Sequence, residues 1–169
     1  MPTIKKRPFQ EIEGVNRLFS TLYNRPVTMR KLPIPRYPNP CMVGAYRQDD
    51  GTLTGLCVTE LTAAASLGGA LSLVSSREMK AVLNEKKFSA VMVDNLQEVM
   101  NICTRLFTPH PTCHVSYQAP VMPVTGPLPA DVAALLRNPK VRADYDVTIP
   151  NYPPGTVRFL APIVELELH

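Results

Sequence analysis

Residues 89–107 read SAVMVDNLQEVMNICTRLF and predict a long amphipathic helix. The apolar residues recur at intervals of four and three, which places on one face Met92, Leu96, Val99, Cys103 and Leu106. The polar residues recur in the same way on the opposite face, which carries Asp94, Glu98, Asn101 and Arg105. We therefore expect the first face to pack on a core and the second to be exposed.

Further helices are predicted before and after this segment. Residues 8–23 have apolar side chains at helical spacing, and a proline is tolerated in the first turn of a helix. Thr59 is placed to cap a helix that ends at Gly68 and Gly69, and Ser75 with Glu78 fits the capping box of the next helix. A short helix is predicted over residues 130–137.

The remaining segments predict strands. Residues 42–47 and 53–59 flank the turn Asp49-Asp50-Gly51, which is typical of a hairpin. Other extended segments are residues 27–32, 117–121, 145–149 and 156–168. Helices and hairpins without regular alternation indicate an α+β fold, with a mostly antiparallel sheet packed against two or three long helices. We expect one domain over residues 1–169 with residues 1–7 flexible, and a homodimer if the long final strand lies at an edge.

Composition narrows the class of protein. The 169 residues carry 18 Lys and Arg against 14 Asp and Glu, and this net charge of +4 is too small and dispersed to favour nucleic-acid binding. No apolar run approaches the roughly 18–20 residues of a membrane span, and no secretory signal is visible. The four cysteines form no CxxC pair. These features predict a soluble cytoplasmic protein with reduced thiols and no membrane partner.

The spacing of Glu98 and Asn101 occurs a second time in the chain. Glu13 and Asn16 have it within the first predicted helix, and in both cases 21 residues separate the asparagine from a proline, Pro38 or Pro123. The repetition predicts weak internal pseudo-symmetry, with each half a helix followed by extended chain.

The segment Asp94-Asn-Leu-Gln-Glu98-Val-Met-Asn101, with Pro123 downstream, resembles the signature of the CheC/CheX/FliY phosphatases of bacterial chemotaxis. That signature is Asp or Ser, three residues, Glu, two residues, Asn, and a proline slightly more than twenty residues later. The order of predicted elements is similar too, so the resemblance implies a CheX-like domain. Many details differ from the common family consensus. Among them, Ile102-Cys103-Thr104 lacks the small residue often found after the asparagine, and Phe9 stands where the first copy needs Asp or Ser. We expect the Glu13/Asn16 copy to be degenerate.

The resemblance also implies an activity. In this family the motif helix docks on the phosphorylated receiver domain of a response regulator in two-component signalling. The asparagine orients the water that attacks the aspartyl phosphate, and the glutamate engages a receiver lysine. This implies catalytic roles for Glu98 and Asn101, with Asp94 and Arg105 supporting or docking. A carboxamide donates and accepts at once, and a carboxylate anchors an ammonium group. The Mg²⁺ belongs to the receiver, so no cofactor of the chain's own is expected.

Other interpretations of these residues stay open. The polar face could be the solvated side of an ordinary helix, or the fold could serve as an inactive adaptor in a motility or signalling complex. Zinc ligation would need residues whose spacing matches no common structural-zinc pattern: Cys103, His110, Cys113 and His114. No Gly-rich phosphate loop is present, and a small-molecule pocket under the Pro-rich loops has no support from particular residues.

Overall fold

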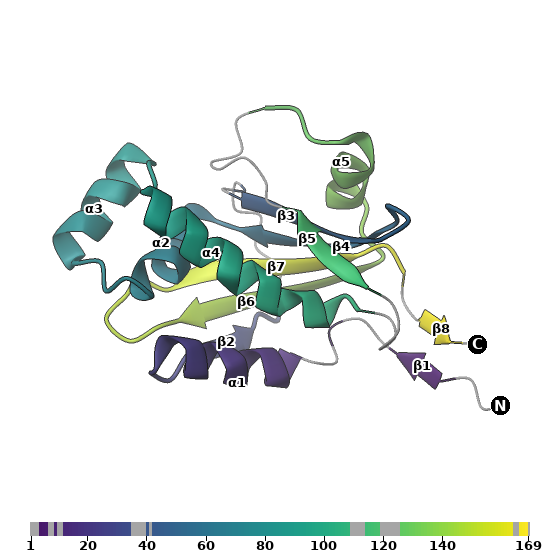
Figure 1. Ribbon diagram of the computed structural model, residues 1–169, viewed down its shortest axis with the longest axis horizontal. Coiled ribbons are helices and arrows are strands. Elements are labelled where there is room, and N and C mark those ends of the chain that lie inside the picture. Colours follow the sequence, from purple (N-terminus) through teal and green to yellow (C-terminus); the bar gives the residue numbers. More distant parts are fainter. Residues whose placement is uncertain are drawn as a thin grey trace.

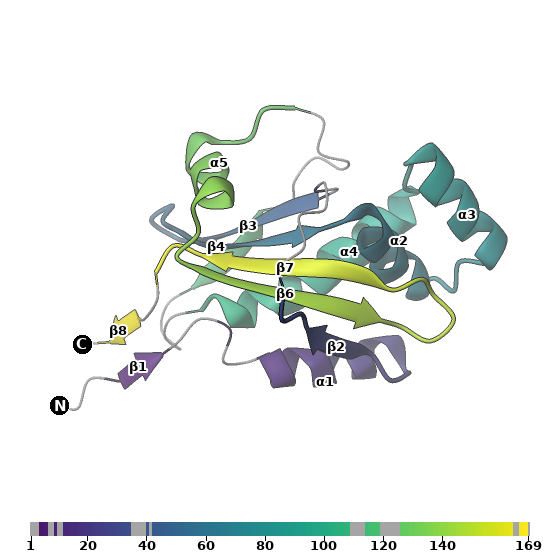
Figure 2. The same cartoon turned by 180° about the vertical axis from the view of Figure 1, so that it is seen from behind.

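The computed structural model describes residues 4–6, 9, 12–34, 40, 42–108, 114–118, 126–163 and 166–168. Its centre is a six-stranded antiparallel sheet in the order β2-β6-β7-β4-β3-β5. The strands are β2 (Thr28–Lys31), β3 (Met42–Gln48), β4 (Leu53–Thr59), β5 (Val115–Gln118), β6 (Val141–Thr148) and β7 (Gly155–Ala161). Strand β1 (Ile4–Lys6), from the segment expected to be flexible, pairs with β8 (Leu166–Leu168) beside the main sheet (Figures 1 and 2).

Helices cover both faces of the sheet unequally. One face carries α1 (Ile12–Tyr23), α2 (Leu61–Ala70) and α4 (Ala90–Ile102), which continues as the 3₁₀ helix η1 (Cys103–Leu106). Helix α3 (Ser76–Glu85) projects beyond the sheet (Figure 1). Helix α5 (Ala130–Arg137) packs on the other face. The α+β class and the antiparallel sheet are therefore confirmed. Within the described residues, no helix is long and apolar enough to span a membrane.

The sheet separates two hydrophobic cores, one on each face. Side chains along each strand alternate between them, because successive residues of a strand point to opposite faces of the sheet. Toward α1, α2 and α4 point Met42, Tyr46, Cys57, Tyr145 and Phe159. Toward α5 point Val43, Ala45, Leu56, Val58 and Leu160. Hydrogen bonds from Nη1 and Nη2 of Arg47 to the two carboxylate oxygens of Asp131 tie α5 to β3.

The face of the sheet on which α5 packs also carries a buried cluster of ion pairs. The Asp144 carboxylate accepts hydrogen bonds from Nη2 of Arg142 at 2.9 Å and from Nε of Arg158 at 3.0 Å. Only 1% of the Asp144 side chain is exposed, so these bonds replace the water it has lost. Burial opposes ionisation, but the two arginines outweigh it and lower the pKa of Asp144.

The strand order contains an internal symmetry. Exchanging β2 with β5, β3 with β6 and β4 with β7 converts the order into its own reverse. Each half is then a helix followed by three strands, α1 with β2, β3 and β4, and α4 with β5, β6 and β7. This confirms the pseudo-symmetry predicted from the repeated Glu-x-x-Asn spacing. It also makes α1 and α4 structural equivalents on the same face of the sheet.

Several predicted boundaries are corrected by the structure. The helix over residues 89–107 is α-helical only to Ile102 and then tightens into η1. Thr59 ends β4, and Glu60 stands at the N-cap of α2 without a side-chain cap. The predicted strand over residues 156–168 is two strands, and β7 lies between β6 and β4. The edge-strand argument for a homodimer is therefore wrong, although the homodimer itself stays a prediction.

Candidate functional site

The amino-terminal half of α4 is fixed by a cap and by close packing on α2. The Ser89 hydroxyl accepts a hydrogen bond from the Met92 amide at 3.2 Å, which satisfies a free donor of the first turn. A Cβ at Gly68 would lie 2.6 Å from the Met92 carbonyl oxygen, so the two backbones approach as closely as glycine allows. Nδ2 of Asn95 donates to the Gly68 carbonyl at 2.9 Å and joins the helices again.

The carboxyl-terminal end of α4 is fixed by the buried side chain of Tyr46. Its hydroxyl donates to the Met100 carbonyl at 2.8 Å, next to Asn101 in the chain. The Tyr46 ring stacks on Phe107 at 4.3 Å between centroids, and Gly55 leaves room for the Phe107 ring. Burial raises the pKa of Tyr46 well above its usual value of 10, so the hydroxyl stays a neutral donor. Asn101 therefore sits on an immobilised turn.

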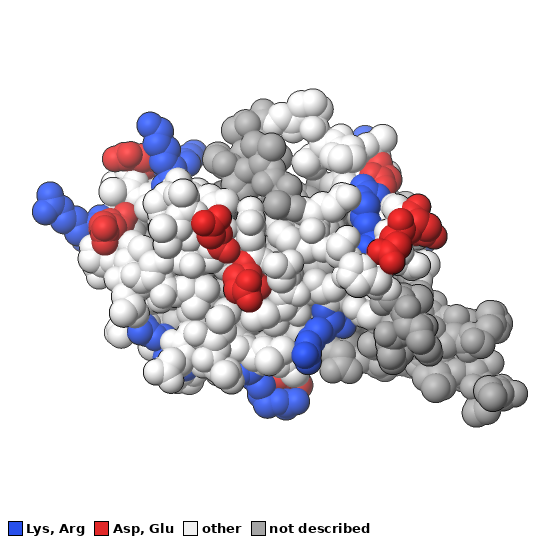
Figure 3. All heavy atoms as spheres, viewed as in Figure 1, with Lys and Arg blue, Asp and Glu red and all other residues white. Residues whose placement is uncertain are grey.

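The predicted polar stripe lies on the outside of this anchored helix. Asp94, Glu98 and Asn101 on α4 and Arg105 on η1 are all exposed. None of these four side chains forms a hydrogen bond or ion pair with another described residue. Figure 3 shows acidic side chains near the middle of this face, with uncharged surface separating them from the nearest basic ones. The stripe is thus free to meet a partner, and the roles of its residues stay predictions.

The first copy of the spacing has a different environment. Glu13 is exposed on α1, but Oδ1 of Asn16 is buried and has no hydrogen-bond partner among the described residues. Phe9 is a core residue, with ring centroids 5.6 Å from Phe107 and 5.9 Å from Phe159. The structure therefore exposes the amide of Asn101 more fully than that of Asn16.

The residues considered for zinc do not come together in the described part of the chain. Cys103 is buried beside Cys57, and both thiols are free. Burial raises the pKa of the Cys57 thiol, with Cys103 as its neighbour. His114 is exposed, with Nδ1 2.8 Å from a carboxylate oxygen of Asp49, while His110 and Cys113 lie outside the described residues. Among the described residues, no three His, Cys, Asp or Glu side chains are placed to hold a metal.

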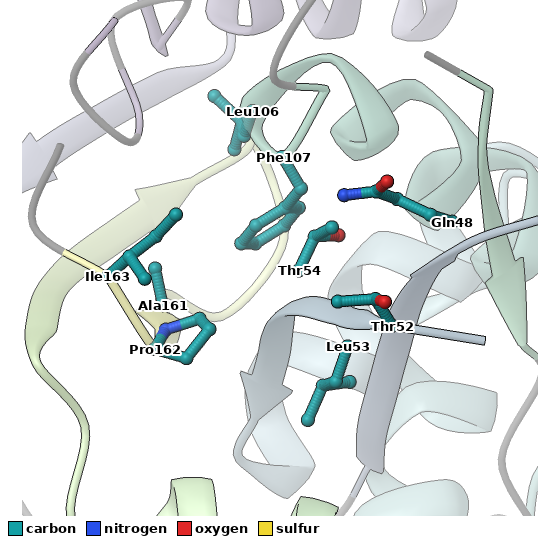
Figure 4. Close-up of a pocket in the computed structure, with 9 residues that line it drawn as sticks. All are labelled: Gln48, Thr52, Leu53, Thr54, Leu106, Phe107, Ala161, Pro162 and Ile163. Atoms are coloured by element: carbon teal, nitrogen blue, oxygen red, sulfur yellow. The ribbon is translucent and has the colours of Figure 1, made fainter. Parts of the chain in front are cut away.

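A small cavity lies between β4, η1 and the end of β7 (Figure 4). Its volume is about 110 Å³, and its lining includes Leu53, Phe107, Pro162 and Ile163. Among the described residues, the polar ones that line it are Gln48, Thr52 and Thr54, and none of the described lining side chains is charged.

Two exposed apolar residues, one in the first turn of α4 and one just after α2, were missed from the sequence. Val91, in the first turn of α4, is 56% exposed and lies three residues before Asp94, so extending the polar spacing backward would have found it. Leu73, in the α2–α3 connection, is 69% exposed. No spacing in the sequence marks it, because its position depends on how α2 ends.

Comparison with known proteins connects this architecture to solved structures. No family model and no curated protein matches the sequence. FliY from Thermotoga maritima matches with a TM-score of 0.59 at 12% identity, covering 89% of this chain and 83% of that one. The FliM middle domain from H. pylori matches with a TM-score of 0.55 at 12% identity, covering 92% and 87%. The chain has the CheC/CheX-like fold.

Other CheC/CheX-like structures that match contain protein partners. FliM in the FliM–SpeE complex from H. pylori matches with a TM-score of 0.58 at 10% identity, covering 92% of this chain and 84% of that one. A FliG–FliM complex from the same organism also matches, with a TM-score of 0.53 at 11% identity, covering 93% and 89%. At these identities the likeness establishes the fold and leaves activity to be argued from the site.

Proposed function

We propose that this CheC/CheX-like domain is a phosphatase that acts on the aspartyl phosphate of a receiver domain in cytoplasmic two-component or chemotaxis signalling. The observation that carries the proposal is the placement of Glu98 and Asn101. They lie one turn apart on the exposed face of α4, without partners among the described residues, on a helix anchored at both ends. A rigid helix that presents an unpaired amide and an unpaired carboxylate suits insertion into a partner's active site.

The chemistry divides between the two proteins. The Asn101 carboxamide accepts a hydrogen bond from a water and directs the oxygen of that water at phosphorus. The bond between phosphorus and the aspartate oxygen breaks as the bond to water forms, which leaves a free carboxylate and inorganic phosphate. The proton of the water leaves with the phosphate or passes to solvent. Glu98 anchors a lysine of the receiver, and the Mg²⁺ bound by the receiver neutralises the transferred group.

A second candidate is an adaptor that binds a partner and hydrolyses nothing. The similarity to FliM favours it, because two of the FliM structures that match this chain are complexes, one with SpeE and one with FliG. An adaptor would use the same exposed face for binding alone. The two candidates differ in whether Asn101 affects a reaction rate.

Phosphatase assays with receiver domains from the same organism, phosphorylated by acetyl phosphate with Mg²⁺, distinguish the candidates. The chain should accelerate loss of phosphate from one of them. Asn101→Ala should reduce that acceleration by roughly 10²–10³, the loss typical of removing one positioned hydrogen-bonding group from an active site. Asn84→Ala, an exposed asparagine on α3, is the matched control and should keep full activity. Binding to a receiver without acceleration would replace the phosphatase by the adaptor.

A further inference from the structure

Leu73 occupies a backbone position that leucine does not favour. The Leu73 amide bonds to the Ala70 carbonyl at 3.3 Å and the Val74 amide bonds to the Gly69 carbonyl at 3.1 Å. These two bonds form a Schellman motif, which ends α2 with residue 73 in the left-handed region at φ +54°. Glycine is the usual residue there, because a Cβ is strained in that conformation. Folding alone would therefore select glycine at position 73.

The surroundings of Leu73 do not stabilise a large apolar side chain by burying it either. The residue is 69% exposed, so most of its surface remains in water. The backbone favours glycine, and the solvent favours a polar group. Leu73 meets neither of these preferences. A residue of this kind is expected where binding to a partner requires an apolar side chain.

Val91 extends the candidate site toward Leu73. It precedes Asp94 by three residues, so Val91, Asp94, Glu98 and Asn101 follow one another along a single exposed stripe of α4. Nδ2 of Asn95 donates to the Ser72 hydroxyl at 2.5 Å. Asn95 lies one turn after Val91, and Ser72 precedes Leu73, so this bond holds both apolar residues at the same end of the stripe.

We infer that Leu73 and Val91 form the apolar half of a docking surface whose polar half is Asp94, Glu98 and Asn101, and that a receiver domain occupies it. The inference rests on the proposed function. Neither carboxylate has a cation among the described residues, so the occupant must bring one. The lysine beside the aspartyl phosphate of a receiver supplies that charge. The occupant must also present an apolar contact beside it, which Leu73 and Val91 cover.

Leu73→Gly separates docking from folding. Glycine relieves the left-handed backbone, so the variant should melt about 2–4 °C higher than wild type. The same change removes the apolar side chain, so KM for the phosphorylated receiver should rise about tenfold while kcat stays constant. A residue with only a structural role would not give a more stable protein that docks more weakly.

Lys86→Gly is the matched control. Lys86 ends α3 in the left-handed region at φ +54° and is exposed, like Leu73, but it lies outside the stripe. It should melt higher by a similar amount with KM unchanged. If wild type accelerates dephosphorylation and Leu73→Gly leaves KM unchanged, the docking inference is wrong and the proposed function stands. If wild type accelerates no receiver, the proposed function fails. The receiver as occupant is overturned as well if wild type also binds none.

Discussion

The close contact between α2 and α4 predicts opposite effects for alanine at two adjacent glycines. Gly68 and Gly69 are both buried in α2, and alanine at either position favours the helix by about 1 kcal/mol through its higher helix propensity. Their surroundings differ. A Cβ at Gly68 would lie 2.6 Å from the backbone oxygen of Met92, whereas a Cβ at Gly69 would lie 2.7 Å from the terminal methyl of Met79.

The two obstacles differ in how easily they move. The Met92 carbonyl belongs to the hydrogen-bonded frame of α4, so relief requires the two helices to separate, at a cost of about 1–3 kcal/mol for overpacking. After the gain in propensity, Gly68→Ala should lower the free energy of unfolding by up to about 2 kcal/mol. The Met79 methyl can turn away, so Gly69→Ala should be neutral or gain up to about 1 kcal/mol.

Urea unfolding followed by circular dichroism measures both variants under the same conditions. The expected result is a lower midpoint for Gly68→Ala and an equal or higher midpoint for Gly69→Ala, with unchanged slopes. Equal midpoints for the two variants, or a Gly68→Ala protein more stable than wild type, would refute the argument that backbone contact sets the distance between α2 and α4.

Three further perturbations test other parts of the fold. Tyr46→Phe should lower the unfolding free energy by about 1–2 kcal/mol in urea, because the Met100 carbonyl loses its buried donor; no change would mean that another donor takes its place. Burial raises the pKa values of Tyr46, Tyr23 and Tyr117 above their usual 10, so the unfolded chain releases these protons first and stability should fall above pH 10. In a titration at 295 nm, part of the absorbance of the six tyrosines should appear only on unfolding, and ionisation of all six in the folded protein near pH 10 would contradict this. Asp144→Asn should cost about 3 kcal/mol by thermal or urea unfolding, since two arginines lose their carboxylate, and a wild-type midpoint would show that the cluster is dispensable.

Much of this architecture could be predicted from local patterns. The spacing of Met92, Leu96 and Val99 identified the buried face of α4, and the capping box of Ser75 with Glu78 is present as expected. These features depend on residues within one or two turns of each other, so the sequence displays them directly.

Features that depend on distant contacts could not be predicted in this way. Helix α4 changes into η1 close to Met100, whose carbonyl accepts a hydrogen bond from the Tyr46 hydroxyl. Tyr46 lies in a strand more than fifty residues earlier in the chain. The position of β7 between β6 and β4 could not be predicted either. The alternation of apolar and polar residues along a strand does not show which strands will be its neighbours. The break after Ala161 did have a local signal in Pro162, which cannot donate to a sheet ladder.

The exchange symmetry of the strand order implies that this chain behaves as an internal dimer. Strands β4 and β7, which the exchange relates, pair with each other at the centre of the sheet and join the two halves. Either half alone would leave that strand edge unpaired and one side of its helix layer uncovered. A second chain is therefore unnecessary for closing the sheet. With two equivalent helices on one face, α1 can serve to pack the core while α4 keeps an exposed amide. Because one polypeptide carries both copies of the helix, its two halves can diverge in role.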